Sequence, residues 1–146
     1  METINLVGKI LATTNKSDFE RDGKTAYIVL ENEEEFKKAN DFGLTIYTSK
    51  EDNQNFIIVP TPQKITVFNN DVRYNLKSNA DSNTKNYVTN DNVDICISKG
   101  VSKEHGNQRF FRLLSIGIND MKQLEFIAPF NPFTGKETKD GGDLIV

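Results

Sequence analysis

The chain has 146 residues, 36% of them hydrophobic, which is enough for one domain that buries a core without disulfides or metal ions. It contains one cysteine, Cys96, and one histidine, His105, so a disulfide framework and a Cys/His zinc cluster are excluded for a monomer. The formal net charge is −3, from 18 basic and 21 acidic residues, which excludes a uniformly basic surface but leaves a local one open.

β-Strand patterns dominate the first thirty residues. In the range 3–14, apolar residues alternate between two faces, and Gly8 marks a position where a strand can kink or bulge. The residues of one face are Ile4, Leu6 and Ile10, and those of the other are Val7 and Leu11. A polar turn over 15–23 leads to a run of β-forming residues over 24–30. The two segments predict a hairpin with a bent first strand.

The middle of the chain predicts a short helix followed by strands. Residues 32–39 begin with an Asn cap candidate and carry acidic residues early and lysines late, as the helix dipole favours. A solvated charged turn is the alternative reading. Three extended segments follow, with turns predicted at 52–53 and 60–62. These segments are 43–49, 55–59 and 64–69.

Residues 70–92 are rich in Asn, Asp, Ser, Thr and Lys and predict a long polar loop. Basic and aromatic side chains such as Arg73 and Tyr74 on this arm would suit clamping a nucleic-acid strand. A solvated loop without a ligand is the alternative.

The most informative stretch is 99–112, in which a glycine-containing turn leads into two phenylalanines flanked by arginines. It follows a short alternating strand over 93–97, so the two predict a β-hairpin. With a period of two, Arg109 and Phe111 share one face, where a cation beside an aromatic ring suits phosphates and bases. The opposite face would carry Phe110, Arg112, Leu114, Ile116 and Ile118. We therefore expect Phe111 on a ligand face and Phe110 nearer the core; core phenylalanines with solvated arginines are the alternative.

The last part of the chain predicts a further strand over 121–128 and then the end of the globular fold, because two prolines and a glycine follow. The expected organisation is one domain over 1–128 and a flexible acidic tail over 129–146. The tail ends in an acidic residue and three apolar residues that suit docking on a partner. They are Asp143, Leu144, Ile145 and Val146.

Taken together, the segments predict an all-β fold, namely a small five-stranded Greek-key barrel of the oligonucleotide-binding (OB) kind with a short helix and a long polar loop. No window of about 18 apolar residues occurs, and the N-terminus lacks a basic region followed by an apolar one. We therefore expect a cytoplasmic protein with no membrane contact.

Two segments resemble bacterial and phage single-stranded-DNA-binding proteins. Residues 4–10, Ile-Asn-Leu-Val-Gly-Lys-Ile, are similar to the opening strand of that family, and residues 106–111, Gly-Asn-Gln-Arg-Phe-Phe, are similar to its last hairpin. The end of the tail resembles the acidic partner-binding tip of the family. The resemblance implies binding of single-stranded DNA without sequence preference, in replication or recombination and in the host cytoplasm if the chain is phage-encoded. Replication or recombination proteins would then be partners of the tail.

In this reading the protein does no chemistry on its ligand. Basic side chains release counterions from the polyanion, and each stacked base adds about 1–3 kcal/mol. The residues expected to bind nucleic acid are Lys9, Lys24, Tyr27, Tyr47, Arg73, Tyr74, Lys99, Arg109 and Phe111. A core role for Tyr27 or Tyr47 is the alternative. No catalytic residue, metal or cofactor is expected.

Two other function classes remain open. A protein-binding module, such as a phage factor that modulates a host enzyme, would use an exposed strand edge or the apolar tail and would suit the net negative charge. A small hydrolase has acidic residues in abundance, but the chain lacks a metal-ligand motif and a Gly-rich phosphate loop. Oligomeric state, including a homo-oligomer, and the choice between DNA and RNA are not determined by the sequence.

Overall fold

The computed structural model describes residues 2–16, 22–50, 53–61, 64–77, 86–102, 106 and 108–127. Within these ranges it leaves undescribed the side chains of residues 12–16, 22–24, 64, 75–77, 86, 102, 108, 109, 126 and 127. The expected tail over 129–146, with its partner-binding residues Asp143, Leu144, Ile145 and Val146, lies outside the described residues.

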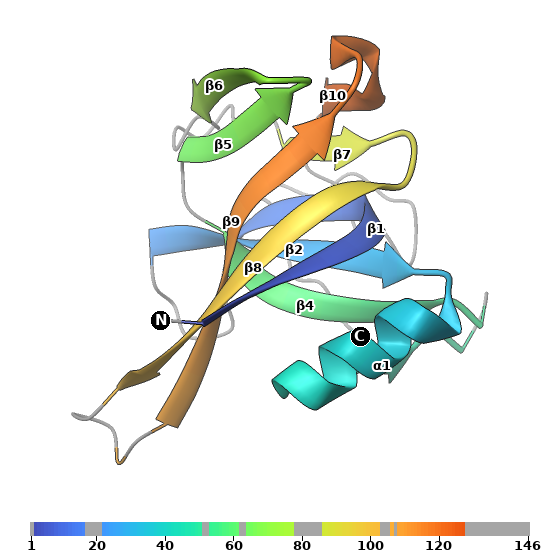
Figure 1. Cartoon of the computed structure of the whole chain (residues 1–146), viewed down its shortest axis with the longest axis vertical. Coiled ribbons are helices and arrows are strands. Elements are labelled where there is room, and N and C mark those ends of the chain that lie inside the picture. The colour runs from blue at the N-terminus through green and yellow to red at the C-terminus, as the bar shows by residue number, and fades with distance from the viewer. Residues whose placement is uncertain are drawn as a thin grey trace.

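The described ranges are all-β apart from one α-helix and one turn of 3-10 helix. Their strands are β1 (Glu2–Lys16), β2 (Asp22–Leu30), β3 (Tyr47–Thr48), β4 (Asn55–Thr61), β5 (Lys64–Asn69), β6 (Val72–Lys77), β7 (Asn86–Thr89), β8 (Val93–Ser102), β9 (Gln108–Ile118) and β10 (Leu124–Ile127). Eight form one sheet in the order β3-β4-β2-β1-β8-β9-β5-β6, and β7 pairs with β10 (Figure 1). The all-β class is confirmed. The expected five-stranded barrel is not shown, because the large sheet of the described residues has eight strands and is not closed, with β3 at one edge and β6 at the other.

β1 belongs to both halves of the large sheet. Its first part pairs antiparallel with β8 as far as Gly8, and its second part pairs antiparallel with β2 from Lys9 onward. At the change of partner, a Cβ on Gly8 would lie 2.8 Å from Ile28 Cγ2 and 2.9 Å from Val29 O. The bend predicted near Gly8 agrees with this change, and only glycine leaves room for so close a β2.

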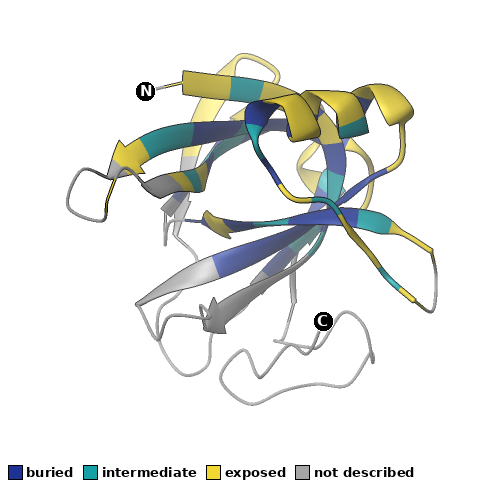
Figure 2. Cartoon of the chain, turned by 90° about the horizontal axis from the view of Figure 1, so that it is seen from below, coloured by how far each residue is buried: buried dark blue, intermediate teal, exposed yellow. Residues whose placement is uncertain are grey.

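The main core lies on the inner face of the curled sheet. Its fully buried members include Leu6, Ile10, Ile28, Leu30, Ile57, Ile65, Ile95, Ile97, Leu113 and Ile116. Figure 2 shows the buried residues lined up along the strands, whereas most of the helix and much of the described connecting chain are exposed. The alternation predicted for β1 is confirmed, since Leu6 and Ile10 are in this core and Val7 is exposed on the opposite face.

Helix α1 (Glu33–Phe42) is three residues longer at its C-terminal end than expected. Asn32 occupies the N-cap position without a side-chain cap hydrogen bond, and three glutamates in the first turn suit the helix dipole. Gly43 ends the helix in the left-handed region at φ 102°, and its N–H donates to Asn40 O at 3.0 Å. Ala39 and Phe42 are buried against the core.

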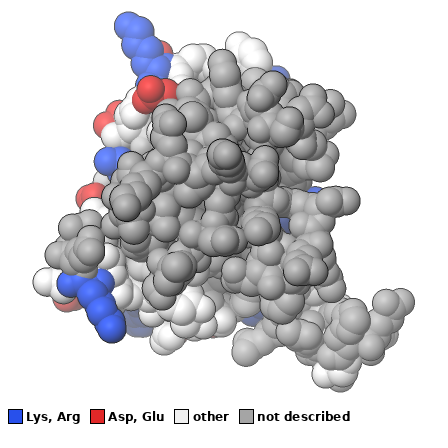
Figure 3. All heavy atoms as spheres, turned by 180° about the vertical axis from the view of Figure 1, so that it is seen from behind, with Lys and Arg blue, Asp and Glu red and all other residues white. Residues whose placement is uncertain are grey.

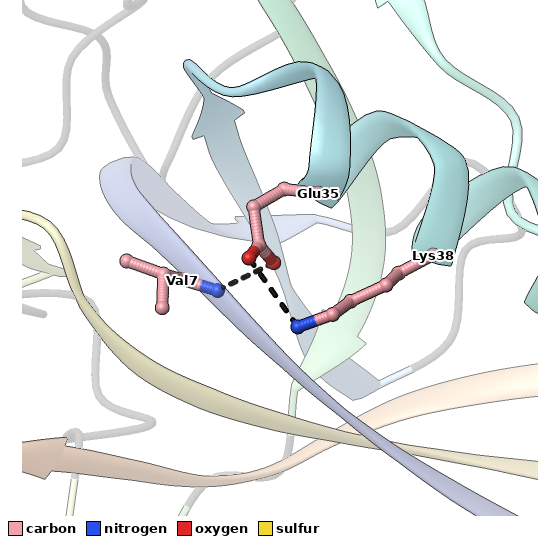
Figure 4. A network of polar contacts seen from close by, with 3 residues as sticks. All are labelled: Val7, Glu35 and Lys38. Atoms are coloured by element: carbon pink, nitrogen blue, oxygen red, sulfur yellow. Dashed lines mark hydrogen bonds and ion pairs between the residues drawn. The ribbon is translucent and has the colours of Figure 1, made fainter.

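A buried carboxylate fastens α1 to the sheet (Figure 4). The Val7 backbone N–H donates to Glu35 Oε2 at 2.9 Å, and Lys38 Nζ lies 3.4 Å from Glu35 Oε1. Because β1 pairs with β2 only from Lys9 onward, this N–H has no β2 carbonyl opposite it. Glu35 thus replaces the missing strand partner at the point where β1 leaves β8 for β2.

The prediction of a long polar loop over 70–92 is wrong in part, because β6 and β7 lie within this range. Tyr87 is fully buried, and its hydroxyl hydrogen-bonds with the Thr61 hydroxyl at 3.0 Å. Thr89 Oγ1 accepts the Ile10 N–H at 2.8 Å. These polar side chains are paired inside the protein, which composition alone does not reveal. Pro60 was also expected in a turn but lies in β4 opposite Thr25, at a stretch of β4 that has no further strand beside it in the described sheet.

Candidate nucleic-acid interface

A β-bulge in β9 decides which of its side chains face the solvent. Cys96 of β8 lies opposite Ser115, but the next residue, Ile97, lies opposite Leu113, so Leu114 is an extra residue. On the two sides of the bulge, the inward positions therefore change from odd to even residue numbers. Leu113 and Ile116 are both fully buried.

The expected orientation of the two phenylalanines is wrong for this reason. Phe110 points outward and is 53% exposed, whereas Phe111 is half-buried and packs against the main core. The Phe111 ring lies 5.9 Å from the Phe42 ring of α1, in a tilted arrangement. The alternation that places Ile118 and Ile116 inward reverses at Leu114, the extra residue, so that Leu113 and Phe111 are inward as well.

The outward face of the β1-β8-β9-β5-β6 part of the sheet carries two aromatic rings and two arginines. We call this group the outer strip, and it consists of Phe68, Arg73, Phe110 and Arg112. Pairing places them on one face, because cross-strand partners point to the same side of a sheet. Phe68 lies opposite both Arg73 and Gly117, and Arg112 lies opposite Ser98. All four side chains are exposed.

Phe110 lies flat against the backbone of its neighbour Gly100. A Cβ on Gly100 would be 2.5 Å from Phe110 Cζ and 2.8 Å from Cε2, so the ring occupies the space above this glycine. One ring face is thereby supported while half of the side chain stays open to solvent. The pair sits in the part of the β8–β9 ribbon that extends past β1, at the lower left of Figure 1. A supported and exposed ring is suited to stacking.

Phe68 and Arg73 form the other end of the outer strip. They are directly opposite each other on β5 and β6, and the Phe68 side chain is 39% exposed. On the other side of β5, Phe68 lies opposite Gly117 of β9. A Cβ on Gly117 would lie 3.2 Å from Asp94 Cβ, so the Asp94 side chain of β8 lies over this glycine. An exposed carboxylate thus sits two strands away from the Phe68 ring.

Of the predicted cations, Lys99 has a structural role. Its Nζ donates to the Phe42 carbonyl at 2.8 Å, lies 3.3 Å from Glu2 Oε2, and sits 4.4 Å from the centroid of the Phe42 ring. It therefore supports the C-terminal end of α1, where a cation suits the dipole. Its side chain is only 16% exposed, which leaves little of it for a phosphate.

The tyrosines of the first half of the sheet lie in or beside a second apolar cluster. Tyr27 is 4% exposed and packs with Val29 and Phe56, so the alternative reading of a core residue holds for it. Tyr47 is 41% exposed, but its ring stacks on Phe56 at a centroid distance of 5.7 Å. Lys9 lies opposite Val29 on the same outward face and is half-buried.

The remaining predicted residues are spread over the sheet. Arg73 belongs to the outer strip, and Tyr74 lies beside it opposite the buried Val67, about half-exposed at the edge. Arg109 of β9 lies opposite Val101, and Lys24 of β2 lies opposite Thr61. The side chains of Arg109 and Lys24 are not described. The structure thus places Arg73 on the same sheet face as three residues that we did not predict. The outward position of Phe68 could have been predicted from its alternation with Val67. The outward positions of Phe110 and Arg112 could be assigned only once the bulge was known.

On the back of the molecule relative to Figure 1, the described charged side chains are of both signs. In Figure 3, described Lys and Arg side chains alternate with Asp and Glu along one edge and form no single basic patch there.

Among the described residues, no group of three or more His, Cys, Asp or Glu side chains could hold a metal ion. No helix in the described ranges has the length and apolar character needed to cross a membrane. No protein-family model, curated protein or solved structure matches this chain at a significant level.

Proposed function

We propose that this protein binds single-stranded DNA without sequence preference, through the outer strip. One observation carries the proposal: Phe110 and Phe68 are both exposed on the same sheet face, each with an exposed arginine nearby. Aromatic rings stack on any base, and arginines pair with phosphates whatever the sequence. In a duplex the base faces are hidden by stacking, so such a surface favours single strands.

The pairing of the strands supports an OB-like arrangement as part of the same proposal. In it, β1, β2, β4 with β5, β8 and β9 would be the five strands of a distorted Greek-key barrel. Two features support this: β1 pairs with both β2 and β8, and β5 pairs in parallel with β9 while β4 pairs with β2. The resemblance of residues 4–10 and 106–111 to single-stranded-DNA-binding proteins points the same way.

The test is a fluorescence-anisotropy titration at low salt with a labelled oligothymidylate longer than the roughly 4–16 nucleotides that an OB fold covers. Phe110→Ala should weaken binding by about 1–3 kcal/mol, because it removes one stacking ring. Val101→Ala is the matched control, since Val101 is 56% exposed on the same ribbon but on the opposite face. Equal affinities of the two variants, or no binding by the parent protein, would contradict the proposal.

A protein-binding module is the second candidate, favoured by the position of β6. This strand is the last of the large sheet in the described part of the chain and carries two exposed apolar side chains, Val72 and Tyr74. An extended peptide could pair with such an edge by main-chain hydrogen bonds. Failure of every oligonucleotide to bind at low salt would move the assignment to this class.

A further inference from the structure

The outer strip has two ends that lie far apart. Phe110 and Arg112 occupy one end, and Phe68 and Arg73 occupy the other beside Gly117. Gly117 is seven positions after Phe110, and one of these positions is taken up by the extra residue of the bulge. At about 3.3 Å per residue, the two rings are roughly 20 Å apart along the sheet.

The surface between the ends offers little to a nucleic acid. The next row of the same face contains Asn5, Cys96, Ser115 and Thr66 in cross-strand register. These side chains are short and uncharged, and the Asp94 carboxylate lies in the row of Gly117 and Phe68, at the second end. Among the described side chains, stacking and charge pairing with a polyanion are therefore confined to the two ends.

We infer that the outer strip is a bipartite site, which takes a single strand long enough to reach both ends and holds it by two linked contacts. This inference rests on the proposed function. Once one end is bound, the second contact becomes intramolecular, so affinity rises steeply when the strand spans the gap. At 3.4 Å per stacked nucleotide, about six nucleotides cover roughly 20 Å, and an extended strand needs fewer.

The experiment is a calorimetric titration with oligothymidylates from well below to well above about six nucleotides. Short oligonucleotides should bind weakly with two per chain, one at each end. Long ones should bind with one per chain and about 10²–10⁴-fold more tightly. The transition between the two stoichiometries should fall where the oligonucleotide first reaches both ends.

Single-ring variants separate the two ends. Phe110→Ala and Phe68→Ala should each lower the number of short oligonucleotides bound from two to one, and each should weaken the binding of a long one by about 5–150-fold, the loss expected for one stacked base. Val101→Ala and Val72→Ala are the matched controls, because these valines are exposed on the paired strands β8 and β6 but on the opposite face. Both controls should leave affinity and stoichiometry unchanged.

Cys96 provides a third measurement. It is the only cysteine in the chain and lies between the two ends on the outward face. Alkylation of its thiol with a bulky maleimide should weaken the binding of long oligonucleotides, which cross this position. The binding of short oligonucleotides should not change.

The outcomes separate the two proposals. Binding that depends on only one phenylalanine, or that shows one short oligonucleotide per chain, would overturn the bipartite site and leave the proposed function standing. Absence of binding at every length would overturn both.

Discussion

At the scale of single residues, Phe110 and Phe111 show how one extra residue exchanges two roles. Both are phenylalanines in the same strand, yet Phe110 covers Gly100 on the outside and Phe111 packs on Phe42 inside. The residue that causes the exchange, Leu114, is three positions further along the chain. Such an effect acts through register, so a substitution at either phenylalanine tests it directly.

Phe111→Ala should lower the free energy of unfolding by about 1–3 kcal/mol, less than for a fully buried phenylalanine because the ring is only partly covered. Urea denaturation measures the change. Phe110→Ala is the comparison and should cost clearly less stability while it weakens oligonucleotide binding. The reverse ranking of the two variants in stability would contradict the inward position of Phe111.

Tyr87 makes stability sensitive to high pH. Burial raises the pKa of its hydroxyl far above the usual value of 10, and the hydrogen bond with Thr61 lowers it only in part. Above pH 10 the unfolded chain loses this proton while the folded chain keeps it, so stability should fall by up to about 1.4 kcal/mol per pH unit. Tyr87→Phe should flatten this decline, at a cost of about 1 kcal/mol at neutral pH for the lost hydrogen bond.

Unfolding free energies measured on both sides of pH 10 check this expectation. Tyr74→Phe is the control, because it removes the hydroxyl of a tyrosine that is partly exposed at the sheet edge. An equal decline in the parent protein and in Tyr87→Phe would contradict the assignment.

At the scale of elements, α1 is held to the sheet at both of its ends. Glu35 in its first turn accepts the N–H of Val7, and the carbonyl of Phe42 in its last turn accepts from Lys99. Both contacts end on strands that neighbour each other, β1 and β8. The helix is therefore positioned by polar contacts as well as by its buried residues Ala39 and Phe42.

Glu35→Ala should reduce stability by about 1–3 kcal/mol, because it leaves the partly buried Val7 N–H without an acceptor. Glu35→Gln keeps an acceptor oxygen and should cost less. Hydrogen exchange of the Val7 amide, together with denaturation, measures the loss. Lys38→Ala is the control and should change stability by less than about 1 kcal/mol, since Lys38 is half-exposed. Fast exchange of this amide in the parent protein would argue against the contact.

At the scale of the whole molecule, the net charge of −3 opposes binding of a polyanion, so attraction must come from local positive charge. The outer strip offers two exposed arginines and faces one exposed carboxylate, Asp94. Affinity should then depend more on stacking than on charge, and only weakly on salt.

With two phosphates neutralised, the logarithm of the binding constant should fall against the logarithm of salt concentration with a slope of about −1.4. Arg73→Gln and Arg112→Gln should each reduce the magnitude of that slope by about 0.7. Lys122→Gln, at an exposed position on the 3-10 turn over Met121–Gln123, is the control. Titrations over a range of salt concentrations give the slopes. Slopes unchanged in both arginine variants would remove these residues from the interface.

Much of the secondary structure could be predicted from the sequence, because it depends on local patterns. Residue type and spacing predict the alternation in β1, the kink at Gly8, helix α1 with its early glutamates, and the late hairpin of β8 and β9. Strands β6 and β7 could not be predicted in this way, because turn-forming residues surround them in the sequence. The polar partner of Tyr87 in β7, Thr61, is distant along the chain.

The candidate site could be predicted only in part. An aromatic and arginine-rich surface was expected on β9, but the sequence does not show that Leu114 is extra, since a bulge exists only relative to the neighbouring strand. Likewise, the assignment of Lys99 to α1 and the burial of Tyr27 arise from elements that are distant along the chain. The sequence by itself therefore determined the all-β class and the strand-forming segments, which are set by short-range periodicity. Only the tertiary structure decided which residues share the outward face, because strand register and long-range packing choose the side on which each side chain emerges.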